Sequence, residues 1–255
     1  MIILKKLSEI RKIAKAGKIL AELFEILPDK LSEGITTIEI DAFIENFIIK
    51  NGAKPAFKGY EGYKFASCIS INREIIHGLP SRKKTIKNGD IVSVDVGTIL
   101  NGYYSDAART YIVGDTKNLL DKKLVKITFE ALEIGIRNAK VGNRIGDISH
   151  SIQKYVESNG FSVVRDFVGH GVGKKLHEDP QIPNFGEPDT GVKIMNGMTL
   201  ALEPMVCQGD WQIDILSDGW TVVTLDGKNA AHFEDTIAIV DNEPVILTRI
   251  EGGLS

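Results

Sequence analysis

The stretch over 93–110, SVDVGTILNGYYSDAART, constrains the fold more than any other part of the chain. At its centre stands Asn101-Gly102, the residue pair that most strongly favours a two-residue type I′ hairpin turn. With these two residues as the loop, Leu100 faces Tyr103, and the register of both flanking strands follows from the turn. The sequence therefore predicts an antiparallel strand pair whose partners can be assigned one by one.

This register places two aspartates on the same face of the hairpin. Asp106 lies opposite Gly97 and Asp95 lies opposite Ala108, and side chains alternate between the faces of a strand. Such diagonal neighbours are about 7–8 Å apart at the backbone, within reach of a shared ion. The residues around Asp95 are apolar, so two buried carboxylates need a positive charge between them. Solvation on an open face, or bonds from turn amides, is the alternative explanation.

Length and charge narrow the class of protein. A chain of 255 residues buries a sizeable core without disulfides, and 43% hydrophobic with 25% charged residues excludes disordered and fibrous classes. A formal net charge of −3 gives no reason to expect nucleic acid or an anionic membrane as partner. The two cysteines, Cys68 and Cys207, make neither a disulfide framework nor a cysteine-type zinc cluster. This cysteine usage suits a reducing cytoplasm, where we expect the protein, and no apolar run reaches the ~20 residues of a membrane span.

Helical and strand patterns alternate twice along the chain. Apolar spacing predicts a first helix over 8–27, and a capping box of Thr36 and Glu39 opens a second helix that ends at Gly52. We expect further helices over 116–139 and 147–159, and strands over 65–71, 91–97, 107–113, 161–167, 198–203, 220–224 and 232–240. This order predicts an α+β fold in one catalytic domain over 1–255, with duplicated halves over 8–114 and 115–240.

Three later segments add candidate metal ligands. His170 lies in GHGVG, where glycines permit tight turns and close approach of a ligand. Glu203 ends an apolar strand in TLALEPM, and Glu234 opens another in HFEDT, although either can be a strand-end charge that reaches solvent. With the two aspartates they form a set of four carboxylates and one imidazole, which suits two ions of Mn, Fe, Co or Zn. Two such ions can share a hydroxide, with Glu203 as the base for the bound water.

The other histidines give weaker signals. His77 stands in EIIHGLP, before a Gly/Pro turn, and His177 stands in KKLHEDP, seven residues after His170. His150 lies in a helical run and His232 precedes an apolar strand. We interpret the last two as packed or exposed histidines without a role in the site.

The spaced set Asp95, Asp106, His170, Glu203 and Glu234 resembles the five-ligand signature of the methionine aminopeptidases of family M24. The segments HGLP, HEDPQIPNFG and DGWTVVT resemble the same family in its type I form, and the likeness extends over 10–240. The gap between His170 and Glu203 is short and lacks the insertion that marks type II.

The resemblance implies a pita-bread fold of the creatinase/aminopeptidase type, with pseudo-twofold halves of helix, helix and strands around a curved antiparallel sheet. It implies two divalent metal ions (Co, Mn, Fe or Zn), with Asp106 and Glu234 bridging both. Asp95 would bind one ion, and His170 and Glu203 would bind the other.

The resemblance also implies an activity and a substrate site. The activity is removal of the initiator methionine from nascent proteins whose second residue is small, by a two-metal activated water with Glu203 as general base. His77 and His177 would contact the scissile peptide and the developing tetrahedral centre. A thioether side chain prefers aromatic and soft apolar walls, and the implied methionine pocket uses Tyr60, Tyr63, Cys68 and Trp220. A monomer that contacts the ribosome transiently is the implied working form.

Two alternatives stay open. An Xaa-Pro aminopeptidase or prolidase shares the fold, but usually carries a separate N-terminal domain for which this chain has no room. A binding protein that has lost catalysis also shares the fold, but such relatives lose metal ligands, and all five are present here. The chain departs from the family pattern at Phe57, Ser105 and Leu176, which concern the shape of the pocket and not the ligands.

Overall fold

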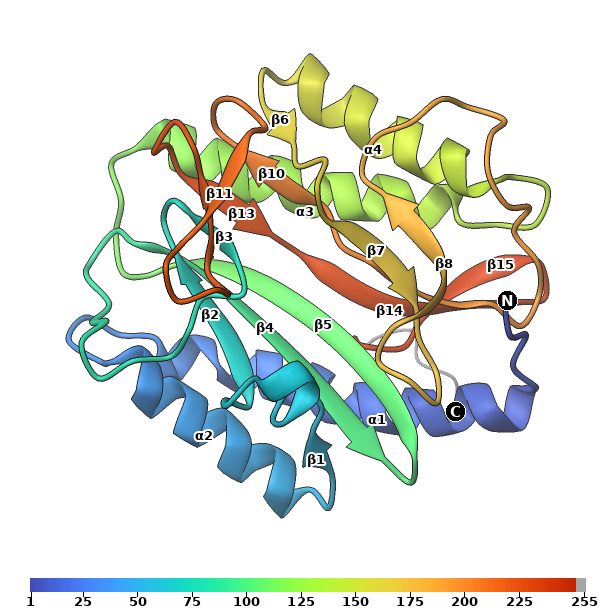
Figure 1. Ribbon diagram of the computed structural model, residues 1–255, viewed down its shortest axis with the longest axis horizontal. Coiled ribbons are helices and arrows are strands. Elements are labelled where there is room, and N and C mark those ends of the chain that lie inside the picture. The colour runs from blue at the N-terminus through green and yellow to red at the C-terminus, as the bar shows by residue number, and fades with distance from the viewer. Residues whose placement is uncertain (251–255) are drawn as a thin grey trace.

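The computed structural model of the chain describes residues 1–250, and its centre is one curved antiparallel sheet (Figure 1). Within those residues the sheet has nine strands, in the order β1-β4-β5-β14-β9-β7-β8, with β2 added on β4 and β15 on β14. Their bounds are β1 Lys54–Pro55, β2 Ser67–Ile71, β4 Ile91–Leu100, β5 Tyr103–Ile112, β7 Val168–Gly171, β8 Glu178–Pro183, β9 Thr199–Leu202, β14 Glu234–Val240 and β15 Glu243–Ile246.

Two pairs of helices cover the two halves of this sheet. Helices α1 (Leu7–Ile26) and α2 (Thr37–Lys50) bury their apolar faces against β2, β4 and β5. Helices α3 (Leu119–Asn138) and α4 (Ile145–Ser158) pack against β8, β9 and β14. In Figure 1 the pair α1 and α2 lies at the bottom and the pair α3 and α4 at the top. Loops, and not α-helices, cover the other face of the sheet between them. None of the helices in the described part of the chain is long and apolar enough to cross a membrane.

The predicted hairpin is present, with the predicted register. Leu100 pairs with Tyr103, Gly97 with Asp106, and Asp95 with Ala108. Asn101 has φ 51° and Gly102 has φ 78°, which are the left-handed conformations that a type I′ turn requires. Both strands run three to four residues further toward the turn than the sequence pattern predicts, because Thr98–Leu100 and Tyr103–Asp106 continue the ladder.

Alternation along β4 separates the core from the site. Val92, Val94 and Val96 are fully buried against α1 and α2. Asp95 and Gly97 therefore face the opposite side of the sheet. The helices thus bury one face of the hairpin, and the carboxylates stand on the other.

Two strand predictions are wrong in part. Over 161–167 only Ser162–Val163 forms a strand (β6), which pairs with β10 (Met205–Cys207) before the chain turns into β7. The expected strand over 232–240 is broken at Phe233, because β13 (Ala230–His232) pairs with β10 while β14 pairs with β5 and β9. The strands β13, β10 and β6 form a second sheet. A third sheet, of which the sequence pattern predicted only the last strand, contains β3 (Glu74–Ile76), β11 (Ile213–Ile215) and β12 (Val222–Thr224).

The helix predictions are correct to within about three residues at each end. The capping box that begins α2 is present, with the Thr36 amide donating to Glu39 Oε2 at 2.9 Å. Short 3-10 turns at Pro28–Lys30 (η1) and Tyr60–Gly62 (η2) complete the elements within residues 1–250. One domain over 1–255 with halves over 8–114 and 115–240 stays a prediction.

Candidate metal centre and its pocket

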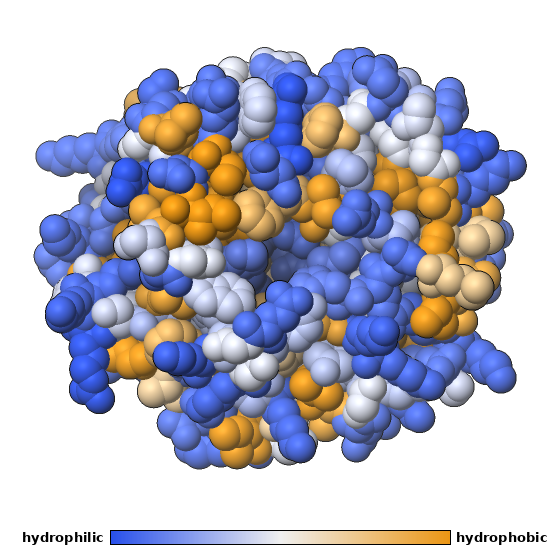
Figure 2. All heavy atoms as spheres, viewed as in Figure 1, coloured by the Kyte–Doolittle hydropathy of each residue, from blue (hydrophilic) through white to orange (hydrophobic). Residues whose placement is uncertain are grey.

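A cavity of about 140 Å³ opens on the sheet face that the helices leave free. Figure 2 shows a hollow near the middle of this side of the molecule, rimmed by both polar and apolar residues. The cavity is lined by Phe57, Tyr60, Glu61, Tyr63, Cys68, His77, Asp95, Asp106, His170, Leu176, His177, Glu203, Trp220 and Glu234. Every site residue expected from the sequence is among them, so the fold brings the whole expected set together.

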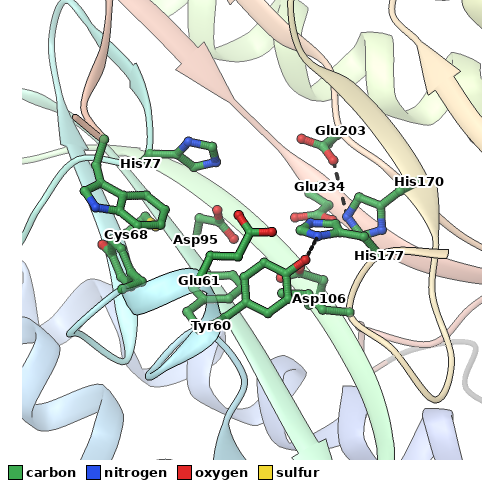
Figure 3. Close-up of a pocket in the computed structure, with 14 residues that line it drawn as sticks. Tyr60, Glu61, Cys68, His77, Asp95, Asp106, His170, His177, Glu203 and Glu234 are labelled. Atoms are coloured by element: carbon green, nitrogen blue, oxygen red, sulfur yellow. Dashed lines mark hydrogen bonds and ion pairs between the residues drawn. The ribbon is translucent and has the colours of Figure 1, made fainter. Parts of the chain in front are cut away.

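Four carboxylates converge from three neighbouring strands and one strand end (Figure 3). Asp95 and Asp106 come from the hairpin, Glu234 begins β14 opposite Ala108, and Glu203 follows β9. Asp106 and Glu234 are 4% and 2% exposed. Among the described residues, Asp95 Oδ1, Asp106 Oδ1 and Glu234 Oε1 are buried without a hydrogen-bond partner. Buried oxygens of this kind are a strong reason to expect a cation between them.

The electrostatics of the cluster supports the same conclusion. Burial raises the pKa of Asp106 to about 7. Burial, and then the neighbouring carboxylates, raise the pKa of Asp95, Glu203 and Glu234 well above the usual carboxyl range. Without positive charge, the cluster holds protons that isolated carboxyls release. The residues present therefore fit bound divalent cations.

His170 presents one ring nitrogen to this cluster. Its Nδ1 lies 2.9 Å from the carbonyl oxygen of Gly171 and donates to it, which leaves Nε2 free as a ligand. Nε2 lies 3.6 Å from Glu203 Oε1, and burial followed by the charge of His177 lowers the pKa of His170 to about 3. Ligand atoms of Asp106, His170 and Glu234 all lie within 4.8 Å of one another. One neutral imidazole among carboxylates is a donor set for Mn, Fe, Co or Zn.

The glycines beside His170 have a different purpose from the one expected. They lie in the strand β7 and not in a turn, and neither has a positive φ. A Cβ on Gly169 would come within 2.5 Å of the Ala201 carbonyl oxygen, and one on Gly171 within 2.2 Å of the Asp179 carbonyl oxygen. The glycines therefore let β8 and β9 approach β7 closely and hold His170 in place.

The two further histidines occupy opposite sides of the cavity (Figure 3). His77 has a left-handed backbone with φ 56°, and burial, then the charge of His177, lowers its pKa to about 4. His177 contacts the ring of His170 at a centroid distance of 4.4 Å. Its Nδ1 lies 2.8 Å from the Tyr60 hydroxyl, and desolvation lowers its pKa against the opposing charge of Glu61. Both imidazoles are thus neutral near pH 7.

The remaining expected residues form an apolar wall. Tyr63 donates its hydroxyl hydrogen to the carbonyl oxygen of Ser67 at 2.9 Å and meets Trp220 edge to face at 4.9 Å. Cys68 pairs with Asp95 across β2 and β4, so its side chain lies directly beside the carboxylates. Burial raises the pKa of Cys68, which keeps it a thiol and a small hydrophobic contact.

The three departures from the family pattern lie in two places. Phe57 and Leu176 line the cavity, and a Cβ on Gly97 would lie 2.8 Å from Phe57 Cε1, so the ring packs on that glycine. Ser105 faces the other side of the sheet, where a Cβ on Gly17 of α1 would lie 2.9 Å from its hydroxyl oxygen. Two departures therefore shape the pocket, and the third does not reach it.

Sequence reasoning missed two residues of the site. His232 is indeed packed, at 1% exposed, but its Nε2 lies 3.8 Å from Glu203 Oε2, beside the cluster. The only signal in the sequence was its place in HFEDT, two residues before Glu234. Glu61 lines the cavity although no pattern singles it out, because a short turn carries it there.

A buried ion cluster around Asp235 stabilises the first residues of β14, next to Glu234. Asp235 is fully buried, and it accepts hydrogen bonds from Arg109 at 2.6 Å, from the Thr248 hydroxyl at 2.7 Å and from Arg249 Nε at 2.8 Å. Arg109 also donates to the backbone carbonyl oxygen of Glu234 at 2.5 Å. The cluster therefore fixes the backbone from which Glu234 reaches the cavity.

Comparisons with known proteins agree with this geometry. Residues 11–241 match the model of metallopeptidase family M24. A methionine aminopeptidase of Clostridium perfringens is 55% identical over 251 residues, which are 98% of this chain and 100% of the relative. The crystal structure of a methionine aminopeptidase from Thermotoga maritima superposes with a TM-score of 0.96 at 53% identity, over 98% of this chain and 100% of that one.

A prolidase from Pyrococcus furiosus has the same fold at greater distance. Its TM-score is 0.79 and its identity 27%, over 98% of this chain and 66% of the prolidase. The expected α+β pita-bread fold is therefore confirmed, and the identities rank the aminopeptidase likeness above the prolidase likeness. The chain belongs to metallopeptidase family M24 and, within that family, to the methionine aminopeptidases.

Proposed function

We propose that this enzyme removes the initiator methionine from nascent polypeptides whose second residue is small. The observation that carries the proposal is the position of the apolar wall of Tyr63, Cys68 and Trp220, directly beside the buried carboxylates. A thioether packs well against aromatic rings and a thiol, so a methionine seated there has its first peptide bond at the cluster. In this proposal the chain acts in the cytoplasm as a monomer, close to the ribosome.

The proposal includes two divalent ions from the set Mn, Fe, Co and Zn. We assign Asp106 and Glu234 to both ions, Asp95 to one, and His170 and Glu203 to the other. Support comes from the buried oxygens without partners and from the free Nε2 of His170. When bound, the ions supply Lewis acidity that makes water a nucleophile near neutral pH.

In this assignment Glu203 is the general base. It accepts a proton from the attacking water and later gives it to the amine that leaves. Its place directly after β9, on the cavity lining beside the other carboxylates, puts it within reach of the attacking water.

His77 and His177 serve as neutral donors to the peptide. The Tyr60 hydroxyl lies 2.8 Å from Nδ1 of His177, and we assign it as the donor, which puts the proton of this imidazole on Nε2. Their lowered pKa values keep both rings neutral, with one N–H each for the carbonyl oxygen on which negative charge develops.

The test is a turnover assay on metal-stripped protein to which Mn, Fe, Co or Zn is returned singly. The peptides are Met-Ala-Ser, Met-Phe-Ser and Ala-Pro-Ser. We expect metal-dependent release of methionine from Met-Ala-Ser alone. Cleavage of Ala-Pro-Ser would favour the Xaa-Pro peptidase instead, and silence on all three with metal bound would favour a binding protein.

A further inference from the structure

Glu61 is the one carboxylate on the cavity lining, within residues 1–250, that the metal assignment does not use. In Figure 3 its carboxylate extends over the cavity, between Asp95 and Glu234. The side chain is exposed, and no hydrogen bond or ion pair to another described residue reaches its carboxylate. Glu61 therefore presents a free negative charge at the mouth of the pocket.

The local backbone holds this side chain over the mouth. Glu61 is the central residue of η2 and has a left-handed backbone, with φ 48° and ψ 24°, between Gly59 and Gly62 with φ 92° and 88°. A residue with a Cβ adopts that conformation at a cost in free energy. The turn also carries Tyr60, whose hydroxyl contacts His177 across the cavity. The charge of Glu61 acts on that same imidazole, where it opposes the effect of burial on the pKa.

No positive charge of the proposed site compensates the carboxylate of Glu61. Two divalent ions, as proposed above, formally balance the four buried carboxylates. No lysine or arginine lines the described part of the cavity. Glu61 is then the excess charge at the entrance, and a peptide substrate brings cations: an α-ammonium of pKa about 7.7–8.0 and any lysine ammonium of pKa about 10.4.

We propose that Glu61 is a specificity-determining residue that binds a substrate ammonium group at the pocket mouth. The inference rests on the proposed function and adds a charge preference to it. The source at the mouth is a lysine side chain that follows the scissile bond, because the α-ammonium is two bonds from the scissile carbonyl carbon and therefore stays at the cluster. An exposed ion pair contributes about 0.2–1 kcal/mol, which corresponds to a change in KM of up to about five-fold.

The experiment measures kcat and KM of the metal-loaded protein for Met-Ala-Ser, Met-Ala-Lys and Met-Ala-Glu. For Glu61→Gln we expect the KM for Met-Ala-Lys to rise by about 1.4- to 5-fold at unchanged kcat. A rise confined to the lysine peptide identifies its side chain as the ligand, and an equal rise for the serine peptide would overturn the inference. About 1 M NaCl, at which the Debye length is about 3 Å, should remove the difference between wild type and variant.

Three variants serve as controls. Glu61→Asn removes the charge while Asn tolerates the left-handed backbone well, so agreement with Glu61→Gln excludes a conformational cause. Glu61→Lys should reverse the preference toward Met-Ala-Glu. Glu243→Gln changes the net charge equally at an exposed position at the start of β15, outside the cavity lining, and should leave KM unchanged.

The outcomes separate this inference from the function on which it rests. A wild-type enzyme that releases methionine while Glu61→Gln leaves every KM unchanged overturns the inference alone. A change in kcat at constant KM also overturns it, because Glu61 would then act on the chemistry. A wild-type protein that releases methionine from none of the peptides, with metal bound, overturns both.

Discussion

The Tyr60 hydroxyl lies 2.8 Å from Nδ1 of His177, and the two rings meet edge to face at a centroid distance of 5.3 Å. Tyr60 comes from the η2 turn and His177 from the loop that precedes β8, so the contact joins the two sides of the cavity mouth. This contact fixes the orientation of the imidazole within the cavity mouth.

Tyr60→Phe should therefore impair turnover without preventing folding. Loss of one hydrogen bond of about 0.5–1.5 kcal/mol predicts a fall in kcat of roughly two- to twelve-fold. Steady-state kinetics on Met-Ala-Ser measures it. Tyr111→Phe is the matched control, because its hydroxyl contacts the carbonyl oxygen of Phe24 on α1, away from the cavity. Equal kinetics for Tyr60→Phe and wild type would contradict the orienting role.

Glu203→Gln should remove the general base while it retains a side-chain oxygen. Loss of a general base lowers kcat by about 10²- to 10⁴-fold. Metal content, measured on the same sample by elemental analysis, distinguishes this effect from loss of an ion. Glu157→Gln, at a partly exposed position on α4, is the control. Wild-type rates from fully loaded Glu203→Gln would exclude Glu203 as the base.

The metal-free protein should lose stability relative to the metal-loaded protein as the pH rises above about 6.5. The raised pKa values of the cluster, that of Asp106 being about 7, mean that the folded metal-free protein holds protons that the unfolded chain has released above about pH 4. The stability that these bound protons contribute is fully present below about pH 4. It is lost as the pH rises through the pKa values of the folded protein. The four histidines with lowered pKa values act in the opposite sense, because the unfolded chain releases its histidine protons at about pH 6.5 and completes that release by about pH 7.5; they are His77, His170, His177 and His232.

The measurement is the Tm of chelator-treated and of Mn-loaded protein at pH 6.5 and pH 8. The cluster carboxyl groups lower the Tm of the chelated protein between these values, by about 2–4 °C for each kcal/mol, while the histidines outside the ligand set shift both forms alike, so the readout is the gain in Tm from metal. Bound cations favour the ionised carboxylates, so the gain in Tm from metal should be larger at pH 8. A metal-induced gain that is equal at both values would refute the cluster as the metal site.

Asp235→Asn should lower the free energy of unfolding of the protein. Arg109 and Arg249 both bond to the fully buried Asp235, and removing one partner of a buried ion pair costs about 3–5 kcal/mol. Urea unfolding monitored by circular dichroism gives the free energy of unfolding. Asp241→Asn, at an exposed position with φ 51°, should differ from wild type by less than about 0.5 kcal/mol. A loss for Asp235→Asn no larger than that of the control would show that the cluster contributes little.

Local rules determined much of what could be predicted. The Asn101-Gly102 turn sets the register of β4 and β5, because turn conformation depends on those two residues and side chains alternate strictly beyond them. Asp95 and Asp106 could thus be placed on one face from sequence alone. The helices were predictable for the same reason, since apolar spacing and the Thr36–Glu39 capping box act within a few residues.

The wrong or missing predictions lie where distant segments compete. Nothing local breaks the apolar run from His232 to Val240, and the break at Phe233 arises because β13 and β14 join different sheets. The glycines around His170 suggested a turn, yet they form a strand whose neighbours come too close for a Cβ.

By itself the sequence determined the hairpin, the helices and the types of group available for the site: carboxylates, an imidazole and a set of aromatic side chains. Only the tertiary structure decided that Phe57 lines the cavity, that His232 lies beside Glu203, and that Glu61 extends over the mouth. The physical reason is the distance along the chain over which each interaction acts. Turn geometry and side-chain alternation act over a few residues, whereas these contacts depend on packing between segments far apart in the chain.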